Sequence, residues 1–153
     1  MADSEAEVVL RRPQQADFNE WSGLWAAYLA FYETSRGEDV HRTLFDRLLS
    51  GDPRHFHAFV AERAGKLVGL VHFVFHPHGW RVEDTCYLQD LYVTPGARGT
   101  GLGRKLIEAV YDAADGAGAP SVYWLTQEFN AEARQLYDRV AEVTPFIRYQ
   151  RAL

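Results

Sequence analysis

The chain has 153 residues, the size of one ordinary domain, and its hydrophobic fraction of 47% is enough to fill a packed core. Its formal net charge of −5 argues against a general electrostatic attraction to nucleic acid or to anionic membranes. The single cysteine, Cys86, has no intrachain partner, which excludes a small secreted fold held by disulfides.

Hydrophobic periodicity and turn residues predict secondary structure along almost the whole chain. The predicted elements are, in chain order, a strand at 8–11, helices at 17–35 and 39–49, strands at 56–63, 66–75 and 80–93, a helix at 102–117, a strand at 121–125, a helix at 130–137 and a strand at 146–150. This order, β-α-α-β-β-β-α-β-α-β, indicates an α/β (α+β) sandwich, with a mixed central sheet of about six to seven strands flanked by about four helices.

The chain is expected to form one domain over residues 1–153, with a short polar tail at 1–7. Its longest nearly apolar run is far too short to span a bilayer. The acidic N-terminal residues lack the basic-then-apolar pattern of a signal peptide. A cytoplasmic location is therefore expected, with no nucleic-acid or membrane partner.

A glycine-rich turn carries the strongest chemical signal. The predicted strand that ends in Leu91-Tyr92-Val93 leads into residues 98–104, RGTGLGR, which open a helix. Unpaired N–H groups at a helix N-terminus bind anions, and glycines leave those groups accessible. The turn therefore suits a pyrophosphate, with Arg98, Arg104 and Lys105 adding positive charge.

Spacing separates this turn from two other phosphate-binding motifs. A Walker P-loop requires a Lys followed by Ser or Thr, whereas Gly103 is followed by Arg104-Lys105-Leu106. A dinucleotide-binding fingerprint requires G-x-G-x-x-G, whereas Gly99, Gly101 and Gly103 are spaced by two throughout. Nucleotide hydrolysis and dinucleotide binding are excluded on these grounds.

The Gly-x-Gly-x-Gly turn after an apolar strand instead resembles the coenzyme A pyrophosphate loop of the GNAT superfamily of N-acetyltransferases. Residues 124–137 resemble a second GNAT signature, a strand followed by a helix with Asn130 at its start and Tyr137 seven residues later. Order and spacing match over about residues 8–151, and the branch most similar is that of the small polyamine, thialysine and histone-acetylase-like enzymes. The resemblance implies transfer of an acetyl group from acetyl-CoA to a primary amine, by direct attack in a ternary complex.

The resemblance also assigns residues to the cofactor. The pantetheine arm would pair with the strand backbone and contact Asn130, while the pyrophosphate would lie on the glycine-rich turn, with Arg134 approaching the phosphates. The implied cofactor-binding residues are Leu91, Tyr92, Val93, Arg98, Gly99, Thr100, Gly101, Leu102, Gly103, Arg104, Asn130 and Arg134.

Family resemblance gives Tyr137 the role of general acid toward the leaving thiolate, because a phenol with a pKa of about 10 can protonate a sulfur whose thiol has a pKa of about 8.5. The acceptor must lose a proton, which costs roughly 4 kcal/mol for a lysine-like amine near neutral pH. Glu83, Asp84 and Asp90 are candidate bases, acting directly or through water. Polyamine acetylases have a Glu where this chain has Gln89, which weakens the argument for a polyamine substrate.

The resemblance also implies that the first helix helps to wall the acceptor site, where its aromatic rings would attract ammonium groups. The predicted substrate-binding residues are Tyr28, Tyr32, Glu83, Asp84, Gln89 and Asp90. The acceptors left open are a polyamine, a lysine-like or thialysine-like small molecule, a basic protein tail and an aminoglycoside.

Two further expectations concern metals and partners. The histidines lack the ligand number and spacing of a zinc site, so no metal is expected. A homodimer is expected through the aromatic-rich strands. A non-catalytic domain that binds or senses acyl-CoA is the alternative to an enzyme, and the presence of Tyr137 favours the enzyme.

Overall fold

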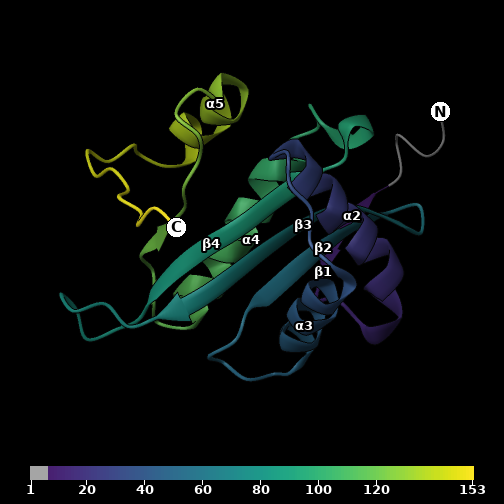
Figure 1. The fold of residues 1–153 in the computed structure, drawn as a ribbon, viewed down its shortest axis with the longest axis horizontal. Helices are drawn as coiled ribbons and strands as arrows, with labels where there is room; N and C mark the ends of the chain where they lie inside the picture. Colours follow the sequence, from purple (N-terminus) through teal and green to yellow (C-terminus); the bar gives the residue numbers. More distant parts are fainter. Residues whose placement is uncertain (1–6) are drawn as a thin grey trace.

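A five-stranded mixed sheet runs through the centre of the computed structural model, which describes residues 7–153 (Figure 1). The predicted polar tail lies outside the described residues except for Glu7. The strands are β1 (Val8–Arg11), β2 (His57–Arg63), β3 (Lys66–His76), β4 (Thr85–Val93) and β5 (Val122–Tyr123), and they lie in the sheet in that order. Strands β1 to β4 are antiparallel to their neighbours, and β5 is parallel to β4. The predicted α/β sandwich is thus confirmed, with five strands among the described residues instead of six to seven.

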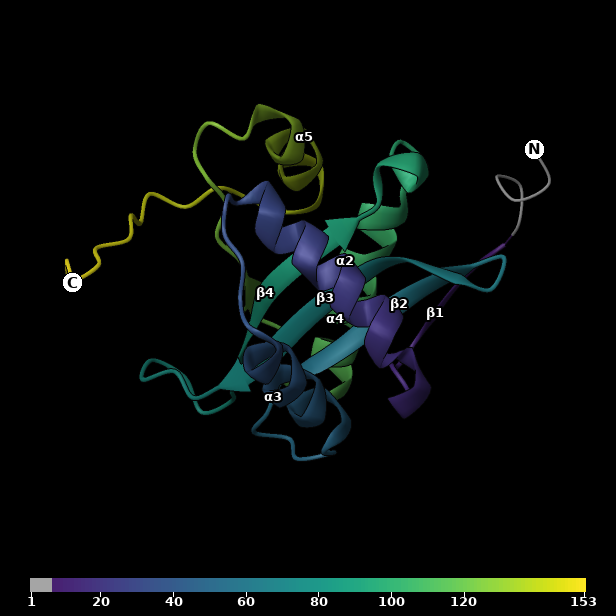
Figure 2. The same cartoon turned by 45° about the vertical axis from the view of Figure 1, so that its right-hand side comes forward.

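Helices cover both faces of the sheet. The helices are α2 (Phe18–Phe31), α3 (Glu38–Leu49), α4 (Leu102–Gly116) and α5 (Ala131–Val140), with short 3-10 helices η1 (Gln15–Asp17) and η2 (Pro95–Ala97). Helices α2 and α3 lie on one face and α4 on the other (Figure 2). Each face has its own core, with Trp21 of α2 and Phe45 of α3 buried on the first side and Leu106 and Ile107 of α4 buried on the second.

Helix α2 is shorter than predicted because the chain turns before Ser35. Glu33 adopts a left-handed backbone conformation, with φ of 58°, and the N–H of Thr34 donates to the carbonyl of Leu29 over 3.1 Å. This pair of features is a common helix C-terminus, and it ends α2 at Phe31.

The hairpin between β2 and β3 is confirmed. Ala64 and Gly65 both have positive φ, at 51° and 77°, as a two-residue turn of this kind requires. The strand that follows is shorter than predicted, because β4 begins at Thr85 instead of Trp80. Residues 77–84 form a loop whose backbone groups are used locally, as in the bond from Arg81 N–H to the carbonyl of His78.

A bulge interrupts β4 at Gln89. Asp90 pairs with His72 on β3 and Leu88 pairs with Phe73, so Gln89 has no partner of its own. Leu88 packs into the core beneath α4, whereas the side chain of Asp90 contacts Trp25 of α2 on the other face. The bulge therefore turns Asp90 toward α2.

The last predicted strands are the least accurate. The strand expected at 121–125 has only two paired residues and is half exposed. No strand forms at 146–150, and Phe146, Ile147 and Tyr149 are 78%, 77% and 90% exposed. Among the described residues, this C-terminal segment has no strand partner, which is why its strand-forming sequence stays irregular.

Candidate active site

A groove opens where β4 and β5 separate. The two strands pair only at Cys86 and Tyr87, so the later part of β4 has no strand on that side. A cavity of about 410 Å³ lies beside it, between β4, the glycine-rich turn, α2 and α5. Its lining includes Tyr28, Phe31, Tyr32, Leu91, Tyr92, Val93, Ala97, Arg98, Gly99, Gly101, Leu102, Gly103, Arg104, Asn130, Glu132, Ala133, Leu136, Tyr137 and Arg139.

The glycine-rich turn presents the N-terminus of α4 to this groove. Gly99 and Gly101 have φ of 77° and 80°, a conformation that side chains disfavour. The N–H of Lys105 donates to the carbonyl of Gly101, so the amides of the first helical turn before it have no acceptor within the helix. A Cβ atom at Gly103 would lie 3.2 Å from Leu136 of α5, which explains the small residue there.

Three arginines line the groove. Arg98 donates from Nε to the carbonyl of Val93, and Arg104 pairs with Glu108 over 2.8 Å. Arg139, which sequence reasoning missed, is the third. Free amides together with these guanidiniums suit an anionic, extended ligand such as coenzyme A.

Two residues assigned to the cofactor have other contacts. Arg134 donates to the carbonyl of Glu128 and lines a neighbouring cavity of about 510 Å³. The hydroxyl of Thr100 donates to the carbonyl of Ala97 and closes the turn. Arg134 and Arg139 lie on the same short helix, so the sequence pattern does not show which of them faces the groove.

Tyr137 lies between the two cavities, on α5. Asn130 begins that helix and accepts a hydrogen bond from the N–H of Ala133, as its position predicts. The Tyr137 ring packs against Trp124, and burial, followed by the proximity of Tyr32, raises the pKa of Tyr137 to about 12. Its hydroxyl is therefore protonated at neutral pH and able to donate.

Tyr28 and Tyr32 face the same groove from α2. Their rings pack edge-on with centroids 5.2 Å apart. Burial is the main cause that raises the pKa of each, and the charge of Asp90 adds to it. Asp90 therefore lies near the hydroxyls of both tyrosines.

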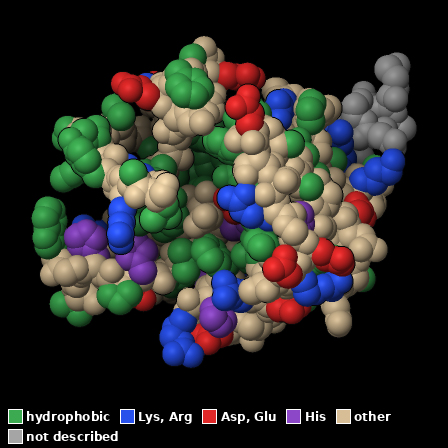
Figure 3. Space-filling model, in the orientation of Figure 1, with side chains coloured by type: hydrophobic (Ala, Val, Ile, Leu, Met, Phe, Trp, Pro, Cys, Tyr) green, Lys and Arg blue, Asp and Glu red, His purple; other side chains and the backbone are tan. Residues whose placement is uncertain are grey.

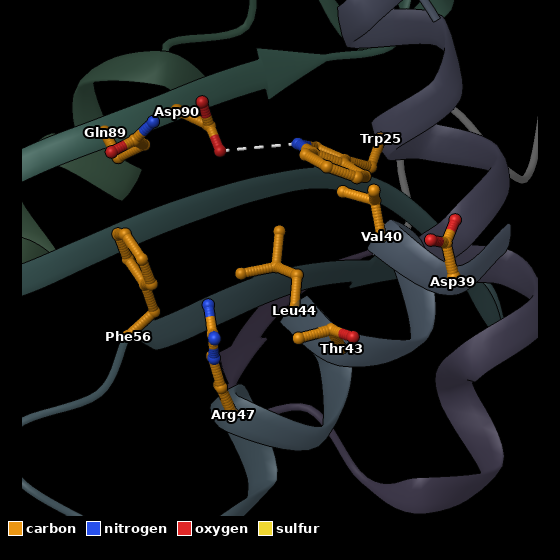
Figure 4. Close-up of a pocket in the computed structure, with 9 residues that line it drawn as sticks. All are labelled: Trp25, Asp39, Val40, Thr43, Leu44, Arg47, Phe56, Gln89 and Asp90. Carbon is orange, nitrogen blue, oxygen red and sulfur yellow. Dashed lines mark hydrogen bonds between the residues drawn. The ribbon is translucent and has the colours of Figure 1, made fainter. Parts of the chain in front are cut away.

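Asp90 also lines a second cavity, of about 350 Å³, on the α3 side (Figure 4). The exposed side chain of Gln89 lines the same cavity, and Arg47 projects into it from α3. Trp25 donates from its indole to Oδ2 of Asp90 over 3.3 Å, and Nδ1 of His72 is 2.8 Å from the same oxygen. The cavity is thus lined by the carboxylates of Asp90 and Asp39 and by the guanidinium of Arg47.

The other two candidate bases lie elsewhere. Glu83 and Asp84 are exposed in the loop before β4 and line a cavity that shares no lining residue with the groove or with the Asp90 cavity. Of the three carboxylates considered from sequence, the structure brings only Asp90 to the tyrosines.

Three further features that bear on function are possible metal ligands, the cysteine and membrane-spanning helices. Over residues 7–153 no cluster of three or more metal-ligating side chains is found. Burial raises the pKa of the Cys86 thiol to about 12, so it is a poor nucleophile. Within the same residues, no helix is long and apolar enough to cross a membrane.

Comparison with known proteins gives a consistent result. The model of the acetyltransferase (GNAT) family matches residues 21–141. The D-amino-acid N-acetyltransferase HPA3 of Saccharomyces cerevisiae is 37% identical over 145 residues, covering 94% of this chain and 90% of that protein. The thialysine N-epsilon-acetyltransferase of Mus musculus is 33% identical over 97 residues, covering 57% of this chain and 55% of that protein.

Solved structures support the fold. The aminoglycoside acetyltransferase AAC(6')-Iy, in complex with a bisubstrate analogue, superposes with a TM-score of 0.83 at 19% identity, covering 97% of this chain and 99% of its own. A ribosomal-protein-alanine N-acetyltransferase from Brucella melitensis biovar Abortus 2308 gives a TM-score of 0.78 at 21% identity, covering 96% of this chain and all of its own.

Proposed function

The chain belongs to the acetyltransferase (GNAT) family, and on that premise we propose that it transfers the acetyl group of acetyl-CoA to the primary amine of a small molecule, by direct attack in a ternary complex. The observation that carries the proposal is one groove that holds the α4 N-terminus, the open part of β4 and Tyr137 together. A single cysteine suits a reducing compartment, and we include a cytoplasmic location in the proposal.

Coenzyme A fits the residues of the groove. The amides of the glycine-rich turn, with Arg98, Arg104 and Arg139, would hold the phosphates, and the open backbone of residues 91–93 would pair with the pantetheine arm. Asn130 would contact the same arm. Bound acetyl-CoA supplies an activated acyl group on a thioester, whose sulfur is the leaving group.

Two side chains would move the protons. Asp90 would accept one proton from the acceptor ammonium, so that the free amine attacks the acyl carbon. Tyr137 would donate its proton to the departing sulfur and recover one from the acylated nitrogen. One proton then passes from Asp90 to water, which balances the reaction. General acid–base assistance of this kind contributes about 10²–10⁴-fold in rate.

The acceptor that the site suits best is an amine that also carries a carboxylate. Asp90 and Arg47 line one cavity, so an ammonium and a carboxylate of the same molecule would each meet an opposite charge. The names of two relatives, a D-amino-acid and a thialysine acetyltransferase, agree with an amino-acid acceptor. A polyamine, which has no carboxylate, would leave Arg47 without a counterion.

A homodimer is also part of the proposal. Hydrophobic side chains gather at the side of the molecule where the C-terminal segment lies (Figure 3). That segment has a strand-forming sequence without a partner, and the short β5 leaves a sheet edge beside it. A second copy of the chain would supply matching strands for both.

The test is release of free thiol from acetyl-CoA with a panel of amines. The panel pairs lysine with cadaverine, which is lysine without its carboxylate, and includes D- and L-amino acids, thialysine, spermidine, an aminoglycoside and a histone-tail peptide. We expect turnover of amino acids and little of cadaverine. Binding of CoA without turnover of any amine would instead support a non-catalytic acyl-CoA sensor.

A further inference from the structure

A buried chain of hydrogen bonds runs from Trp21 through His72 to Asp90. The indole N–H of Trp21 donates to Nε2 of His72 over 2.9 Å, and Nδ1 of His72 lies 2.8 Å from Oδ2 of Asp90. His72 and Trp21 are 0% exposed, and Asp90 is 6% exposed at the end of the chain. The two inner members therefore have no contact with solvent.

The chemistry of the indole fixes the protonation of His72. An indole N–H can only donate, so Nε2 of His72 must be an acceptor and carries no proton. The single ring proton is then on Nδ1 and is donated to Asp90. Protonation of Nε2 would place two N–H groups against each other at 2.9 Å. His72 is consequently a neutral imidazole in one tautomer, and it cannot act as a proton shuttle because both nitrogens are already bonded.

The same arrangement distinguishes the two oxygens of Asp90. His72 and Trp25 both donate to Oδ2, from β3 and α2 respectively. Two donors occupy the two lone pairs of that oxygen. Oδ1 makes neither of these two bonds, so it is the oxygen that an ammonium can reach, with the hydroxyl of Tyr28 as a further hydrogen-bond donor to the same carboxylate.

Asp90 also lacks a fixed positive partner. Across residues 7–153, the only basic side chain within ion-pair distance is His72, which its bond with Trp21 keeps neutral. The other titratable groups that face Asp90 are the hydroxyls of Tyr28 and Tyr32 on α2 and of Tyr87 on β4. A nearly buried carboxylate without a Lys or Arg within ion-pair distance favours a bound cation. The cavity that Asp90 lines is where such a cation can enter.

We propose that Trp21 and His72 are positioning residues, which fix Asp90 as a carboxylate with Oδ1 free to receive the proton of the acceptor ammonium. The inference rests on the proposed function, in which Asp90 is the base. Neither positioning residue lines the groove or the Asp90 cavity, so the list of lining residues alone would not identify them. The indole acts on the reaction only through the tautomer of His72.

Nitrogen NMR of the imidazole tests the tautomer without any acceptor amine. In the wild-type protein we expect the neutral Nδ1–H form of His72, because Nε2 accepts from the indole of Trp21. An Nε2–H tautomer, or a protonated His72 in the wild type, would overturn the inference.

A matched pair of variants tests the positioning role. His72→Asn keeps an amide donor near the place of Nδ1, whereas His72→Leu removes it. We expect His72→Leu to lower kcat about tenfold or more and His72→Asn to stay within about threefold of the wild type, with CoA affinity unchanged in both. Equal losses in the two variants would overturn the positioning role. Circular dichroism and urea unfolding identify variants that fail to fold, and the wild-type NMR result then still decides the tautomer.

Different results would contradict the proposed acetyltransferase function and the positioning role of Trp21 and His72. If the wild type turns over no amine at all, the proposed function is wrong and Asp90 has no ammonium to deprotonate. If amines are turned over but the NMR shows another protonation state, only the role of Trp21 and His72 is wrong.

Discussion

The ring of Trp124 packs edge-on against the ring of Tyr137, with their centroids 5.4 Å apart. This contact fixes the phenol ring of α5 against the strand end that precedes the helix. The hydroxyl of Tyr137 is therefore held at the boundary of the groove, independently of any ligand.

Tyr137→Phe keeps this ring contact and removes only the proposed proton donor. We expect kcat to fall about 10²-fold, within the range of general acid catalysis, while the affinity for CoA changes little. Stopped assays of thiol release and calorimetric CoA titration measure the two quantities. Unchanged turnover would remove Tyr137 from the mechanism.

Gly101→Ala places a side chain at a backbone φ of 80° at the start of α4. The left-handed conformation costs a non-glycine residue roughly 1–2 kcal/mol, so the turn should distort and CoA should bind about tenfold more weakly. Gly96→Ala is the matched control, since Gly96 has ordinary φ and open space around its Cα. Equal CoA affinity in the two variants would contradict the assigned anion site.

Gln89→Glu adds a third carboxylate to the cavity that Asp39 and Asp90 line. A diamine without a carboxylate should then bind better relative to an amino acid, because the added negative charge attracts its ammonium groups and repels a carboxylate. We expect the ratio of kcat/KM for cadaverine to that for lysine to rise about tenfold. Glu83→Gln changes a carboxylate that lines a different cavity and should leave this ratio unaltered. A ratio that moves only with Glu83 would place the acceptor in that other cavity.

Termination after Glu142 removes the exposed C-terminal segment. We expect light scattering to show a dimer for the full chain and a monomer for the shortened one, because the proposed strand partners are lost. Val82→Ser, which removes an exposed apolar side chain from the loop before β4, should leave the dimer intact. A monomeric full chain would contradict the proposed interface.

Asp17→Asn tests an ion pair that joins β1 to the start of α2. Arg11 donates two hydrogen bonds to Asp17, of 2.7 and 3.0 Å, and these bonds are the main cause that lowers the pKa of Asp17. A lowered folded-state pKa stabilises the fold above the unfolded pKa of about 3.9, and this stability is lost as the pH falls through the folded value.

We therefore expect Asp17→Asn to lower the free energy of unfolding by about 1–3 kcal/mol at pH 7, and by much less near pH 2. Urea titrations at both pH values measure the difference. Asp112→Asn, at an exposed position on α4, should change neither value. An equal loss of unfolding free energy at both pH values would show that the charge of Asp17 does not cause the destabilisation.

Local sequence patterns predicted most of the fold correctly. The hairpin turn at Ala64-Gly65 and the start of α5 at Asn130 depend on residues next to each other in the chain, so spacing alone identifies them. The strand predicted at 146–150 did not form, because strand-forming residues need a partner strand that no local pattern specifies.

For the candidate site, the sequence predicted which residues lie together in the groove. The glycine-rich turn and Tyr137 lie at family-specific spacings, and the structure brings them to one groove. The bond between Trp21 and His72 spans 51 positions of sequence, and only the packing of α2 on β3 reveals it. A polar residue inside an apolar strand was the available signal for His72.

The extra residue in β4 has a consequence for how this strand can change. Ordinary strands alternate between faces, so Leu88 and Asp90 would share a face if the ladder were regular. The bulge at Gln89 shifts the phase of that alternation, and it is the reason that a carboxylate meets α2 while Leu88 meets α4. Deletion of Gln89 would make Leu88 and Asp90 adjacent, which gives a regular alternation with Leu88 still beneath α4 and Asp90 still toward α2. A ladder that instead took Gln89 in as a paired residue would place Leu88 and Asp90 on one face, so the position of the base depends on Gln89 staying outside the pairing.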